Sequence, residues 1–345
     1  MTFIPRSVAA VLAAALSLTG LAACSNNPAA PSQTAPGQAA PLKVVVAFYP
    51  FEFVAQRVGG DLVNVENLTT PGAEAHDVEL TPRQLGGLAE ADLVVYQSGF
   101  QPAVDDALTQ VTPKRTLDTA AFLTLLTAEG DDGHDHGQEE GEDHADEEQA
   151  DDHAEEGGDD HAEEGDDDHD HGAYDPHTWL DPTNLAAIAE HVRDALSETD
   201  PSHAEAFAAN ATALVADLTA LDQEFTDGLA QCQRTTFITS HAAFGYLAHR
   251  YHLEQVGIRG LEPDVEPTAA RIAEVQQIAR DEGVTTIFFE TLVSPVVAES
   301  IARDLGLATD VLDPLEGLTD ESRGNDYLEV MRANLSALRT ANSCS

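Results

Sequence analysis

Three histidines and one aspartate occupy positions from which their side chains could meet around a single ion. His76, His241 and Asp313 each follow a short apolar stretch that predicts a strand, and His177 lies between two Asp-Pro steps. Ligands of open parallel sheets bind outside the carboxyl ends of the strands, so we expect these side chains to converge. Three imidazoles and a carboxylate suit Zn²⁺, at ~2.0–2.2 Å from each donor atom, whereas manganese favours more oxygen donors.

The segment that contains His177 is constrained by proline on both sides. It runs from Tyr174 to Pro182 and includes Trp179, the only tryptophan of the chain. Proline fixes its own φ and restricts the residue before it, so the two Asp-Pro steps should hold the segment extended. We call residues 174–182 the bracket, and we expect it to be rigid and to present one imidazole.

Short apolar stretches alternate with helical patterns along the chain, as in a parallel α/β sheet. A long helix is expected from about Pro201 to Leu229, with Asp200 as its cap. We therefore expect an α/β protein of two lobes, each with a mostly parallel four-stranded sheet flanked by helices, joined by a long rigid backbone helix. The expected strands are 43–48, 62–68, 93–96, 235–239, 254–258, 285–289 and 309–312, and the expected helices are 51–58, 81–90, 102–110, 183–196, 201–229, 243–251, 268–281, 295–305 and 326–339.

An acidic insert precedes the bracket. Residues 129–172 hold 23 aspartates and glutamates, no lysine or arginine, and few apolar side chains. Such a segment cannot bury enough apolar area to fold, so we expect a disordered loop. Its histidines would gather zinc weakly near the main site, with a solvated spacer as the alternative. They are His134, His136, His144, His153, His161, His169 and His171.

The charge of the chain excludes one large class of partner. The formal net charge is −46, whereas a surface that binds nucleic acid must be basic to neutralise phosphates. Much of the charge is local, because the chain outside the insert has 39 acidic and 16 basic residues. We therefore expect no nucleic-acid partner and an acidic but otherwise ordinary globular protein.

The N-terminus has the pattern of a secretory signal. Arg6 precedes an apolar run, residues 8–21, that is too short to span a bilayer but suits a signal peptide. The sequence Leu21-Ala22-Ala23-Cys24 then matches a lipobox. We expect a signal peptide over 1–23, a lipid on Cys24, a disordered tether over 24–41, and a protein anchored to the outer face of the cell membrane. A plain signal peptide with an incidental cysteine is the alternative.

Two further cysteines remain in a compartment that favours disulfides. With Cys24 assigned to a lipid, Cys232 and Cys344 form an even pair, and we expect a disulfide between them. The bond would tie the C-terminal tail to the start of the second lobe. Two free thiols or two metal ligands are the alternatives.

From Leu42 to its end, the chain resembles the zinc-type, ZnuA-like solute-binding lipoproteins of ABC metal importers (cluster A-I), a family that also holds manganese binders and adhesins. The matching motifs are Phe48-Tyr-Pro-Phe51, Gly72-Ala-Glu-Ala-His76-Asp77 before Thr81-Pro82, Asp175-Pro-His177-Thr-Trp-Leu-Asp181-Pro182, Ser240-His241-Ala-Ala-Phe-Gly-Tyr246 and Leu312-Asp313-Pro314. The resemblance implies two α/β lobes joined by a long helix, with the metal between them and a His-rich loop before the second histidine. Manganese members tend to have a glutamate at the position of His241, so this histidine favours zinc.

The resemblance leaves the fourth ligand open. Some zinc members have a glutamate immediately before the first histidine, but here that residue is Ala75 and Glu74 stands one position further back. We favour Asp313 as the fourth ligand, with Glu74 or water as alternatives. Glu290 follows the expected strand 285–289, so we expect it to support a ligand or to anchor a loop.

These observations divide the chain into parts and imply a function. Residues 42–182 form the expected N-terminal lobe with the insert, 183–230 a helical linker with the spine helix, and 231–345 the C-terminal lobe. The resemblance implies an extracytoplasmic protein that captures Zn²⁺ in the cleft between the lobes and delivers it to an ABC permease. We expect this protein to be a monomer.

Two other functions stay open on the sequence. Three histidines with an open position would also describe a zinc hydrolase, but no motif such as His-Glu-x-x-His supplies a general base, so we do not expect an enzyme. A surface adhesin, or a zinc-buffering lipoprotein without a permease, is the other alternative.

Overall fold

The computed structural model describes residues 40–127 and 174–345 of the chain. The expected signal peptide, the lipid site at Cys24 and most of the tether lie outside the described residues. The acidic insert lies outside them as well, with the seven histidines that the sequence suggests as auxiliary zinc ligands.

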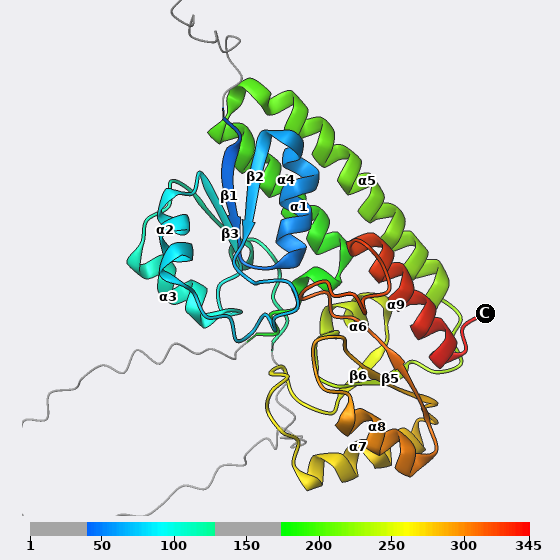
Figure 1. The fold of residues 1–345 in the computed structure, drawn as a ribbon. Coiled ribbons are helices and arrows are strands. Elements are labelled where there is room, and N and C mark those ends of the chain that lie inside the picture. The colour runs from blue at the N-terminus through cyan, green and yellow to red at the C-terminus, as the bar shows by residue number, and fades with distance from the viewer. Residues whose placement is uncertain (1–39, 128–173) are drawn as a thin grey trace, which may run out of the picture. The chain divides into compact units, whose positions relative to one another are not determined.

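The N-terminal lobe is built on a sheet of four parallel strands in the order β2-β1-β3-β4 (Figure 1). Its strands are β1 (Leu42–Val46), β2 (Val63–Asn67), β3 (Leu93–Tyr96) and β4 (Thr116–Asp118), and its helices are α1 (Tyr49–Gly59), η1 (Gly60–Leu62), α2 (Pro82–Glu90), α3 (Pro102–Gln110) and η2 (Thr119–Ala121). Thr81 caps α2 with a capping box, in which its hydroxyl accepts from the Gln84 N–H.

The C-terminal lobe repeats this plan, with four parallel strands in the order β6-β5-β7-β8. Its strands are β5 (Thr236–Thr239), β6 (Glu254–Gly257), β7 (Thr286–Phe289) and β8 (Ala308–Val311), and its helices are α6 (Gly245–Tyr251), α7 (Ala269–Asp281), α8 (Val296–Leu305) and α9 (Tyr327–Asn342). The predicted fold class, two lobes with parallel four-stranded sheets, is confirmed.

A helical linker joins the two lobes. The bracket contains η3 (Thr178–Leu180), and after it come α4 (Pro182–Thr199), η4 (Pro201–His203) and α5 (Ala204–Leu229). Figure 1 shows α5 beside α1 and α4 over its first half and beside α9 near its end, so the predicted spine helix is confirmed. Within the two described ranges, no helix has both the length and the apolar character needed to cross a membrane.

One hydrophobic core runs through both lobes. It includes Val44 of β1, Leu221 of α5, Phe237 of β5 and Phe288 of β7. Side chains alternate between the two faces of a strand, so the neighbouring residue Val45 packs instead into a smaller cluster under α2 and α3. The shared core means that the lobes cannot separate without exposing apolar area to water.

One strand was not located from the sequence. The sequence pattern predicts the positions of only three strands in the first lobe, whereas the structure has a fourth, β4, at the sheet edge. β4 is three residues long and only partly buried, so it lacks the apolar run by which the other strands were found.

The predicted disulfide is present. Cys232 and Cys344 are bonded across 112 positions of sequence. Ser345 N–H also donates to the Gln231 carbonyl, and Gln233 N–H donates to the Asn342 carbonyl, both at 3.0 Å. The C-terminal tail is therefore fastened to the chain just before β5.

Replacing both cysteines, in the variant Cys232→Ser/Cys344→Ser, should lower the free energy of unfolding by about 2–5 kcal/mol, because the bond restricts a long loop of the unfolded chain. Urea unfolding followed by circular dichroism measures this change. The wild-type protein unfolded with a reductant is the matched control and should behave like the variant. Equal unfolding midpoints for the oxidised wild type and the variant would contradict the prediction.

Candidate metal centre

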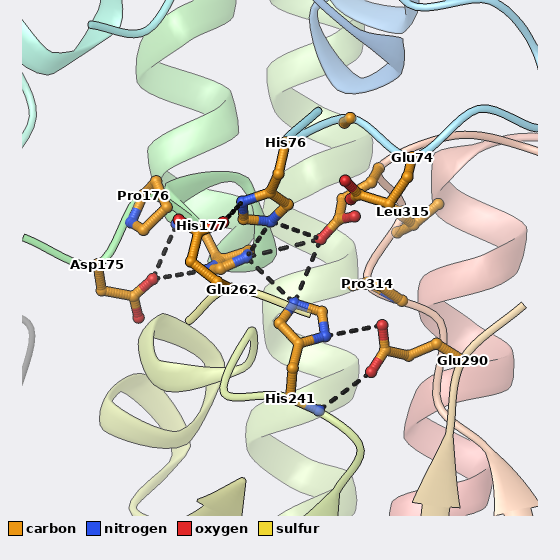
Figure 2. A network of polar contacts seen from close by, with 12 residues as sticks. Glu74, His76, Asp175, Pro176, His177, His241, Glu262, Glu290, Pro314 and Leu315 are labelled. Atoms are coloured by element: carbon orange, nitrogen blue, oxygen red, sulfur yellow. Dashed lines mark hydrogen bonds and ion pairs between the residues drawn. The ribbon is translucent and has the colours of Figure 1, made fainter. Parts of the chain in front are cut away.

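Four buried side chains converge between the lobes. The Nε2 atom of His177 lies 3.3 Å from Nε2 of His76 and 3.4 Å from Nε2 of His241. Oε1 of Glu316 lies 3.5 Å from each of these three nitrogens. All four donor atoms lie within 4.8 Å of one another, and none of the four residues is more than 5% exposed. Figure 2 shows the three imidazoles pointing toward one another.

The spacing of these atoms fits one tetrahedral metal ion. The edge of a tetrahedron is about 1.6 times its centre-to-corner distance, so edges of 3.3–3.5 Å place a central ion about 2.0–2.1 Å from each donor. Zn–N and Zn–O bonds in proteins have this length. An arrangement of three imidazoles and one carboxylate is thus able to hold Zn²⁺ with protein atoms alone.

His76 is held by the loop that follows β2. The ladder of β2 continues past its end, because Leu68 N–H donates to the Val46 carbonyl at 2.9 Å. The side-chain amide of Gln101 then donates to the Thr69 hydroxyl (3.0 Å) and to the Ala75 carbonyl (2.8 Å), which fixes the loop on either side of its turn. The imidazole of His76 is left facing the other lobe.

His177 is held by Asp175, its neighbour in the bracket. Oδ1 of Asp175 accepts from the backbone N–H of His177 at 2.9 Å and from its Nδ1 at 2.7 Å. A proton on Nδ1 leaves the lone pair of Nε2 free for a metal, as in carboxylate–histidine–zinc arrangements. Trp179 anchors the same segment, since its Nε1 donates to the Pro314 carbonyl of the C-terminal lobe at 2.7 Å.

His241 is held in the same manner by Glu290. It follows β5, and its Nδ1 lies 2.8 Å from Oε2 of Glu290, which follows β7. Oε1 of Glu290 also accepts from the backbone N–H of His241 at 3.2 Å. Figure 2 shows Glu290 beside His241, on the side of the ring away from the other imidazoles. Glu290 therefore contacts a potential ligand and is not itself among the four converging donors.

Asp313, expected from the sequence as the fourth ligand, is not in the converging group. Its Oδ1 accepts from the Leu315 N–H at 2.8 Å, and its Oδ2 accepts from the Ser322 hydroxyl at 2.9 Å. These bonds close a turn in which Leu315 takes a left-handed backbone conformation (φ 60°), uncommon for a residue with a branched side chain. The turn directs the next side chain, Glu316, toward the histidines, so Asp313 shapes the loop and Glu316 takes the fourth corner.

Glu74, the other candidate for the fourth position, is also outside the group. Its Oε2 accepts from the Asp77 N–H at 3.2 Å. Partial burial and the nearby charge of Glu316 raise the pKa of Glu74 to about 8. With Glu316 as the fourth donor, a water molecule is not needed to complete the tetrahedron.

The sequence pattern does not identify Glu316, because Asp313 stands nearer to the end of its strand. Rules based on strand ends favour the first acidic residue after the strand, which here is Asp313. The available signal was a second acidic residue, three positions further on in Asp313-Pro-Leu-Glu316. Choosing between the two requires knowledge of the turn that joins them.

The four side chains perturb one another's protonation. Burial opposes a charge on Glu316, but hydrogen bonds from His177, His241 and His76 hold the pKa of Glu316 well below its usual value. Burial likewise opposes a charge on His241, but Glu290 and Glu316 together raise its pKa to about 10. The pKa of His177 is also raised, because Asp175 and Glu316 outweigh the effect of burial. The raised pKa values of His177 and His241 thus favour protonated imidazoles beside the buried carboxylates.

Comparisons with known proteins show which family the chain is similar to. Residues 44–341 match the family model ZnuA, described as zinc-uptake complex component A, periplasmic. The chain is 36% identical over 336 residues to the zinc-binding lipoprotein AdcA of Streptococcus pneumoniae (serotype 4, strain ATCC BAA-334 / TIGR4), which covers 95% of this chain and 60% of AdcA. It is 33% identical over 325 residues to the high-affinity zinc uptake system protein ZnuA of Bacillus subtilis (strain 168), which covers 92% of each chain.

A solved structure is similar over nearly the same range. The Zn(II)-bound ZnuA-like domain of Streptococcus pneumoniae AdcA has a TM-score of 0.66 and 32% identity, over 88% of this chain and 99% of that domain. The chain therefore spans about 60% of the length of full AdcA, and most of the length of Bacillus subtilis ZnuA.

Two isosteric variants distinguish the fourth donor, Glu316, from Asp313, which holds the turn before it. Glu316→Gln should weaken zinc binding at least about 10-fold, because loss of an outer partner alone costs 10–100-fold and this change removes a donor's charge. Asp313→Asn keeps an oxygen for the Leu315 N–H, so it should change the affinity only a few-fold. Competition with a chromophoric zinc chelator measures both, and thermal unfolding checks that each variant is folded. A larger loss in Asp313→Asn than in Glu316→Gln would contradict this assignment.

Proposed function

We propose that this chain, which belongs to the ZnuA family, captures Zn²⁺ in the cleft between its lobes and delivers it to an ABC permease. His76, His177, His241 and Glu316 are the proposed ligands. The observation that carries the proposal is the spacing of their donor atoms, 3.3–3.5 Å for the measured pairs, in a buried position. Supporting it, the similar proteins are named for zinc binding and zinc uptake, and a similar solved structure contains Zn(II).

Delivery to a permease is proposed from the family description, in which ZnuA is a component of a zinc-uptake complex. The lobes should move little relative to each other during capture and release, because they share one hydrophobic core and the bracket is bonded to the C-terminal lobe. We also propose that the protein acts as a monomer.

Binding is favoured over zinc-dependent hydrolysis. A catalytic zinc keeps one position open for water or substrate, whereas a closed site is typical of a bound, non-reacting ion. Here protein atoms can fill all four corners of the tetrahedron. Adhesion, which the sequence leaves open, has no specific support among residues 40–127 and 174–345 and is not part of the proposal.

The location of the protein is proposed from its N-terminal sequence. The signal peptide of residues 1–23 would direct export, and a lipid on Cys24 would anchor the mature protein to the outer face of the membrane. The similar protein AdcA is named a lipoprotein, and the family model is described as periplasmic. The boundaries of the tether (24–41), N-terminal lobe (42–182), linker (183–230) and C-terminal lobe (231–345) belong to the same proposal.

The acidic insert has a proposed auxiliary role. Its carboxylates would attract cations over about a Debye length, ~8 Å at physiological salt, and its histidines would bind zinc weakly near the cleft. The main site would not depend on it, since none of the four proposed ligands belongs to residues 129–172.

Zinc binding at pH 7 should release at least about one proton per ion, because the raised pKa of His241, about 10, keeps this imidazole protonated in the zinc-free protein. The affinity should consequently fall as the pH falls, about tenfold per pH unit for each proton released. Isothermal titration calorimetry in two buffers of different ionisation enthalpy measures the number of protons. Equal binding heats in the two buffers would contradict the prediction.

The function is tested in a strain that lacks this gene and grows in the presence of a zinc chelator. The strain should grow poorly, added zinc should restore growth, and a plasmid copy of the wild-type gene should do the same. A copy with His177→Ala should fail, because it lacks one proposed ligand. A copy without residues 129–172 should restore growth at moderate chelation, since its main site is intact. Normal growth of the deleted strain under chelation would contradict the proposal that the protein serves zinc import. Added manganese is the matched control, and it should fail to restore growth.

A further inference from the structure

Tyr246 bonds to both chain ends that flank the acidic insert. Its hydroxyl accepts a hydrogen bond from the Leu126 N–H and donates one to the Asp175 carbonyl, both at 2.9 Å. The two ends also bond to each other, since the Asp175 N–H donates to the Leu126 carbonyl at 2.9 Å and Thr127 forms an antiparallel bridge with Tyr174. A single hydroxyl from the C-terminal lobe therefore fastens the point where the chain leaves and re-enters the described part of the N-terminal lobe.

Asp175 links this point to the proposed zinc site. Its backbone is bonded to Tyr246 and Leu126, and its carboxylate holds both the Nδ1 and the backbone N–H of His177. Asp175 and Tyr246 are at most 5% exposed, and His177 is fully buried. A shift in the backbone of Asp175 would therefore be transmitted to the orientation of the imidazole.

Gly245 makes room for this contact. A Cβ atom at position 245 would lie 2.3 Å from Oδ2 of Asp175, closer than two such atoms can approach. The carboxylate of Asp175 lies against the backbone at the start of α6 because residue 245 has no side chain. Any larger residue would displace the group that orients His177.

The same short segment also supplies another proposed ligand. His241 precedes Gly245 by four positions, and the segment between them leads directly from the end of β5 into α6. We propose that Tyr246 and Gly245 are positioning residues for His177, acting through Asp175, so that residues 241–246 provide one zinc ligand and aim a second. This inference rests on the proposed function, because it concerns the affinity of the same site.

The physical consequence of the Tyr246 hydrogen bonds is that movement of the acidic insert is not transmitted to His177. His177 lies three residues after Tyr174, and Tyr174 lies two residues after the end of the acidic insert, 129–172. Without a bond at this junction, forces on the insert would act directly on the backbone of a proposed ligand. The hydroxyl of Tyr246 fixes these two chain ends to the opposite lobe. The imidazole of His177 therefore keeps its position relative to His241.

The test uses the full chain with the substitution Tyr246→Phe, which removes only the hydroxyl. Zinc affinity should fall about 10-fold, as expected for loss of a partner outside the ligands. Tyr251→Phe is the matched control, because Tyr251 lies on the same helix and its hydroxyl donates to Asp222 at 3.0 Å, away from Asp175. The control should bind zinc like the wild type. Equal affinities of Tyr246→Phe and the wild type would overturn the proposal.

A double variant shows whether Tyr246 acts through Asp175. Asp175→Asn alone should weaken zinc binding by about 10–100-fold, and adding Tyr246→Phe should weaken it by no more than about a further twofold, because the two changes break one chain of contacts. A general loss of stability would instead reduce the affinity of both backgrounds by the same factor. The proposal would be overturned if the fold loss of zinc affinity in the double variant equalled the product of the losses in the two single variants.

A measurement without zinc separates this inference from the proposed function. In the zinc-free protein, the proton between Nδ1 of His177 and Asp175 should give a downfield nuclear magnetic resonance signal, which Asp175→Asn abolishes. Tyr246→Phe should shift or broaden the signal, whereas Tyr251→Phe should leave it unchanged. An unchanged signal in Tyr246→Phe overturns the positioning role whether or not the protein binds zinc. A wild type without a tight zinc site would refute the proposed function alone.

Discussion

A buried carboxylate that faces three imidazoles is the constraint on which the centre of this protein depends. Glu316 is 1% exposed, and hydrogen bonds from His177, His241 and His76 lower its pKa. Burying an unpaired charge is costly, so positive charge must be present beside it. Protons on the imidazoles can supply this charge in the metal-free protein, and a divalent ion can supply it in their place. The proposed capture of zinc would then exchange protons for one ion at a position that is buried and already charged.

The two lobes hold the donor atoms at the spacing that one tetrahedral zinc ion requires. The four side chains come from four separate segments, which are the loops after β2, β5 and β8 and the bracket. The bracket belongs to the expected N-terminal lobe (42–182), yet Trp179 donates to the Pro314 carbonyl and accepts at its own carbonyl from Tyr327, both at 2.7 Å. These bonds and the shared core fix one lobe against the other, which favours a preformed site over one assembled by closure.

The acidic residues around the four converging side chains have different structural roles, which depend on their distance from the donor atoms. Asp175 and Glu290 each hold the Nδ1 side of one imidazole, which orients the ring and leaves Nε2 available. Asp313 holds the turn at Leu315 and so directs Glu316. Membership in the ZnuA family and the geometry of these contacts support the same proposal, a zinc carrier whose ligands are oriented by carboxylates behind them.

The sequence by itself determined the fold class, nearly all of the helices and strands, the disulfide and the three histidines that converge. These features follow from local properties, because apolar periodicity, proline positions, the cysteine count and short motifs are all visible along the chain. Only the tertiary structure decided that Glu316 and not Asp313 completes the group, that β4 is an edge strand, and that Tyr246 bonds to the base of the insert. Each of these depends on where a turn points or on contacts between residues far apart in sequence, and one-dimensional patterns contain no such distances.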